Sequence, residues 1–222
     1  MFRTSLATLV LFASLNAASL AATPTLDDAI ADLGHRWAKV SYQTPKDGKE
    51  AAFDTLIAHA QQVAQAYPGR AEPMIWEAIV LASAAKADGG LGALSKVKQA
   101  RTLLLAAEKI NPTALNGSVY NSLGSLYAKV PGWPIGFGDK QKAKAYLEKA
   151  LAINPDGIDP NYFYADLLAD QGDYVHAADH LKRALAAPAR PGREDADAGR
   201  RKEVQQLLDS LRQKHGDQLA GR

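Results

Sequence analysis

A short pattern of small and apolar residues repeats along this chain, and it constrains the fold more than any other feature. Its first copy is Ala143, Leu147, Ala150 and Pro155, and its second copy, 34 residues later, is Ala177, Leu181, Ala184 and Ala189. Positions spaced by three and four residues lie on one face of an α-helix. Alanines on such a face let an antiparallel helix approach closely, and leucines fill the space between. The pattern therefore predicts pairs of packed helices repeated along the chain.

The rest of the sequence also favours helices. Ala, Leu, Lys, Gln and Glu are frequent, and Gly and Pro gather between the helix-forming stretches. Runs of alternating β-branched residues, which indicate strands, do not occur. Thr25, Asp139 and Asp173 are predicted N-caps because their side-chain oxygens can accept backbone N–H bonds. The predicted helices are 26–42, 49–67, 72–87, 95–110, 115–129, 139–154, 160–171, 173–187 and 199–214.

A 34-residue helix–turn–helix period is typical of the tetratricopeptide-repeat (TPR) family. The string Ala107–Pro112 also recurs as Ala150–Pro155, and the chain resembles this family over residues 72–188. The resemblance implies an all-α fold in which helix pairs stack into a right-handed superhelix. The predicted parts are 22–70 as a degenerate helix pair, 71–190 as repeats (about 75–112, 117–155 and 158–189), and 191–222 as a C-terminal capping helix and tail.

Two repeats depart from the family pattern. The middle unit has seven extra residues, 131–137, between its helices, and the first has about six extra around Gly89, Gly90 and Gly92. The extra segment 131–137 is unusual because it combines Trp133 and Phe137 with two prolines and glycines. Prolines restrict the backbone, so we expect an ordered loop. Its two aromatic rings either pack on the neighbouring repeat, near Tyr162, Phe163 and Tyr164, or form a wall of a binding pocket.

The first residues predict export. Arg3 precedes an apolar run from Leu6 to Leu15, and small residues follow at Ala21 and Ala22. This layout is typical of a secretory signal peptide, here residues 1–21, and it predicts a periplasmic protein. The alternative is a short membrane anchor, but the run is shorter than the roughly 20 residues that span a bilayer. No membrane insertion is expected after signal cleavage.

Composition excludes several classes of function. The chain has no cysteine, so disulfides, thiolate metal sites and cysteine nucleophiles are excluded. Its net charge is +2 without a block of like charge, so nothing favours nucleic acid. No Gly-x-Ser-x-Gly, Walker or His-Glu-x-x-His motif occurs, and no catalytic residue, metal or cofactor is predicted.

Two polar clusters can be compared with metal sites. His176 and His180 share a helix face, but the repeat places Ala177 and Leu181 inside, so both histidines are expected to face solvent. The aspartates around Asp156 and Asp159 lack the spacing of an EF-hand calcium loop. Turn formation explains them more simply.

The family resemblance also indicates a binding surface, because the first helix of each TPR unit lines the concave face. An ordinary solvated helix face is the alternative interpretation. The candidate binding residues are Trp76, Ile79, Ser83, Lys86, Asn121, Ser125, Lys129, Tyr162, Asp166 and Asp170, together with Trp133 and Phe137 from the inserted loop.

These observations favour a periplasmic scaffold that binds a polypeptide in its concave groove, without catalysis. An alternative is a solute-binding accessory of a transporter, because Gly138–Lys140, Ala143 and Asn161–Ala165 are similar to the T component associated with TRAP transporters. That resemblance implies a small acidic or apolar solute and a transporter partner. A cell-wall-acting enzyme is the third alternative.

Overall fold

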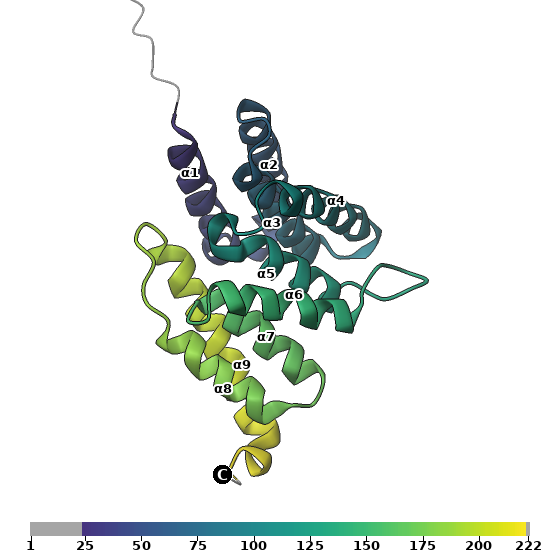
Figure 1. The fold of residues 1–222 in the computed structure, drawn as a ribbon, viewed down its shortest axis with the longest axis vertical. Helices are drawn as coiled ribbons and strands as arrows, with labels where there is room; N and C mark the ends of the chain where they lie inside the picture. The colour runs from purple at the N-terminus through teal and green to yellow at the C-terminus, as the bar shows by residue number, and fades with distance from the viewer. Residues whose placement is uncertain (1–23, 221–222) are drawn as a thin grey trace, which may run out of the picture.

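A computed structural model describes residues 24–220 of the chain, and this part is an array of antiparallel helices (Figure 1). Within residues 24–220 the structure has nine α-helices, one π-helical turn and no β-strand. The elements are α1 (Leu26–Ala38), η1 (Lys39–Gln43), α2 (Lys46–Ala66), α3 (Ala71–Asp88), α4 (Gly90–Ile110), α5 (Ala114–Lys129), α6 (Lys140–Ile153), α7 (Ile158–Asp170), α8 (Tyr174–Ala186) and α9 (Glu194–Ala220).

The predicted all-α fold is confirmed, and most helices lie where the sequence places them. Two helices begin five residues earlier than predicted, α4 at Gly90 and α9 at Glu194. The three predicted N-caps are confirmed by their hydrogen bonds. Thr25 forms a capping box with Asp28, Asp139 accepts from the backbone of Gln141 and Lys142, and Asp173 accepts from His176 N.

Helices pair in the order in which they follow one another. The most extensive contacts join α3 with α4, α5 with α6, and α7 with α8. The repeated small and apolar residues lie at these contacts, since Ala143, Leu147, Ala177 and Leu181 are fully buried. The closest approach is at Gly124 of α5, where an added Cβ would lie 2.5 Å from Leu147 Cγ. The repeat pattern therefore marks the interfaces within each helix pair.

The C-terminal helix α9 has two packing partners. Its middle part buries Val204, Leu208 and Leu211 in a cluster with the alanines of α8. Its first turn contacts α1 and η1, and Ala196 joins the buried cluster of Leu33 and other residues near the N-terminus. The helix therefore caps the last repeat and also reaches the first helix, so that the two ends of the array meet (Figure 1).

The predicted signal peptide, residues 1–21, lies outside the described residues. In residues 24–220, no helix has the length and apolar character needed to cross a bilayer.

Replacing Gly124 tests the packing between α5 and α6. Gly124→Ala should lower the free energy of unfolding by about 1–3 kcal/mol, because its methyl group would overlap Leu147. Gly92→Ala is the matched control, since nothing lies within 4 Å of a Cβ there and alanine favours the helix. Chemical denaturation measures both. Equal stability of the two variants would contradict close packing at Gly124.

Candidate binding cavity

The concave side of the array encloses a cavity of about 1180 Å³, here called the central cavity. Its lining residues come from η1, from every described helix except α8, and from the segment 189–203 that includes the first turns of α9. The contacts of α9 with α1 and η1 therefore place the first helix and the beginning of the last helix around the same space. The cavity is larger than the roughly 300–1,000 Å³ of ordinary small-molecule pockets.

Most of the candidate binding residues meet at this cavity. The repeat frame assigned them to three separate helices, α3, α5 and α7, whose concave faces turn to one space. The residues that line it are Trp76, Ile79, Ser83, Lys86, Asn121, Ser125, Lys129, Tyr162 and Asp166.

Three candidates do not line the cavity. Asp170 instead forms ion pairs with Lys129 (2.9 Å) and Lys140 (3.2 Å). Phe137 packs edge-on against Tyr127, and the guanidinium of Arg101 lies 4.3 Å from its ring centre. Trp133 is 90% exposed.

The two aromatic residues of the inserted loop between α5 and α6 differ in their surroundings: Phe137 packs on the array, although on Tyr127 and Arg101 instead of near Tyr162, whereas Trp133 is exposed. Backbone bonds from Gly138 N to Pro131 O and from Asp139 N to Tyr127 O close the base of the loop. The tip therefore projects away from the helices (Figure 1), and Trp133 does not pack near Tyr162–Tyr164. Pro131 and Ile135, which were not predicted, contribute to the cavity wall in its place.

The N-terminal wall of the cavity is aromatic. Trp37 of α1 meets Trp76 of α3 edge-on, with ring centres 6.2 Å apart. Trp37 Nε1 donates to Ser83 Oγ (2.9 Å), and Ser83 Oγ donates to Ile79 O (2.8 Å). Ser83 therefore fixes the tryptophan ring, which gives this predicted binding residue a structural role.

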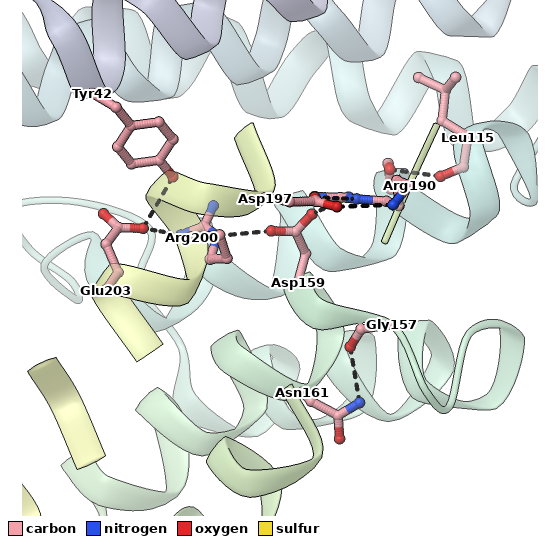
Figure 2. Close-up of polar contacts among 10 residues, drawn as sticks. Tyr42, Leu115, Gly157, Asp159, Asn161, Arg190, Asp197, Arg200 and Glu203 are labelled. Atoms are coloured by element: carbon pink, nitrogen blue, oxygen red, sulfur yellow. Dashed lines mark hydrogen bonds and ion pairs between the residues drawn. The ribbon is translucent and has the colours of Figure 1, made fainter. Parts of the chain in front are cut away.

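The C-terminal wall is charged, and Asp159 is its centre (Figure 2). Asp159 of α7 pairs with Arg190 (2.7 Å) and Arg200 (2.8 Å). Arg200 also pairs with Glu203 (2.5 Å), which accepts a hydrogen bond from the Tyr42 hydroxyl of η1 (3.2 Å). The network joins the last repeat to α9 and then to the N-terminal helices.

This network changes the ionisation of its members. Burial acts to raise the pKa of Asp159, but Arg200 and Arg190 outweigh it and hold that pKa at about 2. Burial and Glu203 raise the pKa of Tyr162 to about 12. The Arg200 guanidinium lies 4.8 Å from the Tyr162 ring centre and 4.7 Å from that of Phe163. These aromatic faces therefore stabilise a cation that is itself almost buried.

Sequence reasoning missed the charged wall. It makes Asp159 a turn residue, and it places Arg190 and Arg200 in or beside a polar cap. Their partners lie 31 and 41 residues away in the sequence, and no local pattern reports such a pairing. The sequence feature that could have indicated this charged wall is the group of arginines close together after Pro188.

The histidine pair is not uniformly solvated, which corrects the expectation above. His176 is exposed and its Nδ1 lies 2.8 Å from Asp173. His180 is half-buried, and its Nδ1 lies 2.8 Å from Asn161 Oδ1. Because Asn161 Nδ2 already donates to Pro155 O and Gly157 O, its Oδ1 accepts here and His180 Nδ1 donates. Between residues 24 and 220 no group of His, Asp or Glu is arranged to hold a metal ion.

Removing the central carboxylate tests the network. Asp159→Asn should lower the free energy of unfolding at pH 7 by about 3 kcal/mol, because it leaves Arg190 and Arg200 without their shared anion. Asp209→Asn, which removes an exposed pair with Arg212, should have almost no effect. Urea denaturation of both variants measures the difference, and similar costs would contradict a special role for Asp159.

The same contribution has a defined pH dependence. The folded-state pKa of Asp159 lies below its unfolded value, so the stabilisation is present above about pH 4 and is lost as the pH falls toward 2. The stability gap between the wild type and Asp159→Asn should therefore shrink by about 2 kcal/mol across that window. A constant gap between pH 6 and pH 2 would show that Asp159 is not a charged partner of the arginines.

Two aromatic substitutions separate the cavity wall from the loop tip. Tyr162→Ala should cost about 2 kcal/mol, because the ring packs on Phe163 and beneath Arg200. Trp133→Ala should stay within about 0.5 kcal/mol of the wild type, since the ring is exposed. Thermal melts of the two variants provide the measurement. A large loss in Trp133→Ala would show that the loop tip packs on the array.

Part of this chain matches a known protein family. Residues 135–193 match the family model described as tetratricopeptide repeat. No curated protein matches.

Several solved structures are similar at low identity. MamA has 18% identity and a TM-score of 0.44, covering 80% of this chain and 98% of its own. A thermophilic TPR protein of Thermus thermophilus has 16% identity and a TM-score of 0.44, covering 84% and 98%. PilF of Pseudomonas aeruginosa has 16% identity and a TM-score of 0.36, covering 86% and 92%. Similarity at this level says nothing about what the chain binds. The family match and the helix pairs agree, and the chain is similar to the tetratricopeptide-repeat family over residues 135–193.

Proposed function

We propose that this chain is a periplasmic scaffold protein that holds a segment of another polypeptide in its central cavity. The observation behind the proposal is the convergence of residues from three successive helix pairs on one space. The cavity is lined by Trp76 and Ile79 of α3, by Asn121 and Ser125 of α5, and by Tyr162 of α7. A tetratricopeptide-type array generally serves protein interaction, which supports a protein partner. The signal-like sequence of residues 1–21 supports the periplasmic location.

The size and chemistry of the cavity suit a peptide segment. Its volume of about 1180 Å³ exceeds that of ordinary small-molecule pockets. Aromatic rings, amide and hydroxyl groups, and charged groups of both signs line it. Such a mixture matches the composition of protein interfaces, in which aromatic residues and Arg supply most of the binding energy. Binding by shape and pocket complementarity requires no bond-making step.

A second candidate function follows from the way α9 closes the array. An open groove would favour an extended peptide, whereas the contacts of α9 with α1 and η1 bring the first helix and the beginning of the last helix around the cavity. This enclosure favours a solute-binding accessory of a transporter as the alternative. The two candidates differ in whether the occupant is a polypeptide.

Site-specific photocrosslinking distinguishes these functions. A benzophenone amino acid at Ser125 would face the cavity, and the same group at Lys144 would face solvent as a control. With the protein expressed in the periplasm, the proposal expects a polypeptide adduct from position 125 and none from position 144.

Other outcomes count against the proposal. Equal adducts from both positions would indicate non-specific contact. A lack of adducts at 125, together with a small molecule released on denaturation of the purified protein, would establish the solute-binding alternative.

A further inference from the structure

The lining of the central cavity has more positive than negative charge. Six basic side chains and three acidic ones contribute to it. The three acids are Asp159, Asp166 and Glu203. This excess of positive charge favours an anionic occupant, because the electrostatic potential of a net charge is focused within low-dielectric walls.

Every one of these acids is already paired with a basic residue. Asp159 pairs with Arg190 and Arg200, and Asp166 pairs with Lys129 at 2.8 Å. Glu203 pairs with Arg200, as Figure 2 shows, and its Oε1 lies 3.8 Å from Lys86 Nζ. The three acids share four basic partners, so Lys49 and Arg193 are the two lining basic residues without an acidic partner in the described part of the chain.

These two residues differ in their surroundings. Lys49 Nζ donates to Ser41 O at 2.8 Å, which partly satisfies it. Arg193 has no ion pair with any residue in the range 24–220, and its Nε is buried without a hydrogen-bond partner. Burial and the neighbouring Arg190 lower the pKa of Arg193 and outweigh the opposing effect of Asp159 and Asp197, so a further anion would relieve an unfavourable charge.

The chain holds Arg193 in place by several contacts. It lies in a turn before α9, in which Arg193 N donates to Arg190 O and Gly192 adopts a φ of 71°. The guanidinium lies 5.0 Å from the Trp76 ring centre. Gly34 is close to both residues, since an added Cβ there would lie 3.3 Å from the Trp76 ring and 3.6 Å from Arg193 Nε. Arg193 is therefore preorganised beside an aromatic ring instead of being free in solvent.

The groups near this arginine indicate what an occupant would carry beside its charge. Trp37, Trp76 and Ile79 supply apolar surface along the same wall. Trp76 and Asn121 also line the cavity, and their Nε1 and Oδ1 atoms are buried without a hydrogen-bond partner among the described residues. A peptide segment offers apolar side chains for this wall, and backbone donors and acceptors for the polar residues that line the cavity.

We infer that Arg193 is the anion-binding residue of the central cavity, and that it takes the carboxylate of an acidic side chain flanked by apolar residues in the bound polypeptide. The inference rests on the proposed function for the polypeptide nature of the occupant. The excess positive charge, the unpaired guanidinium and the adjoining apolar wall define the site.

The first arm of the test uses two dyes with the same aromatic body. 1-Anilinonaphthalene-8-sulfonate has a negative charge, and N-phenyl-1-naphthylamine lacks it. Arg193→Gln should weaken binding of the anionic dye about tenfold and leave the neutral dye unaffected, because only the former loses a charge-assisted bond. Arg212→Gln, which removes an exposed arginine of α9, is the control and should change neither. Circular dichroism melts confirm that each variant is folded.

The second arm uses an array of peptides with blocked ends, each made with Glu or Gln at its centre. The wild type should prefer the Glu member of binding pairs, and Arg193→Gln should lose that preference. Unchanged affinity for the anionic dye in Arg193→Gln overturns the anion site, whether or not peptides bind. A selective loss of the anionic dye without any peptide binding overturns the polypeptide occupant and with it the proposed function, but leaves the site at Arg193.

Discussion

The pairing of Asp159 with two arginines determines how this chain closes. Both arginines belong to the C-terminal part, Arg190 in the segment before α9 and Arg200 within it, whereas Asp159 belongs to the last repeat. A buried ion pair adds little net stability over apolar packing, because desolvation offsets most of the attraction. Its effect here is positional. Without Asp159, Arg190 keeps only Asp197 and Arg200 keeps only Glu203, both on the C-terminal side, so the bond to the last repeat is lost. Through Glu203 and Tyr42 the same network reaches η1, so the ends of the array are joined by directional bonds.

The fold was predictable because its determinants are local. Asp139 and Asp173 mark helix starts through bonds that span two or three residues. Ala143 and Leu147 mark a buried face through helical spacing alone, and both are fully buried. The early start of α9 was not predictable, because its polar first turns have no apolar periodicity. They are held as a helix by contacts with α1 and by the pairing of Arg200 with Asp159, which depend on the tertiary structure.

The candidate site, too, was predictable only where it depends on local sequence patterns. The repeat frame assigns the concave faces of α3, α5 and α7, and nine of the twelve candidate residues line the central cavity. The repeat frame does not determine how a loop between two helices is oriented. The aromatic content of segment 131–137 does not indicate whether its side chains point toward the array or toward solvent. Backbone bonds at the loop base turn Trp133 outward. Arg193 also escaped prediction, because its position depends on a turn that meets Trp76, more than 100 residues earlier in the chain.

Helix α9 both caps the last repeat and contributes to the cavity wall, and this links binding to stability. Val204 and Leu208 of α9 cover the last repeat, while Arg200, one turn earlier, forms part of the cavity wall. A ligand that binds only the closed arrangement stabilises it by mass action, and the docking of α9 is stabilised by the same amount. Conversely, any change that loosens α9 removes part of the cavity and weakens binding without touching the ligand. Loss of binding in a variant of α9 therefore identifies a contact residue only when the melting temperature is unchanged. Arg193 meets that condition better than Arg200, because Arg193 has no ion pair to lose within the described part of the chain.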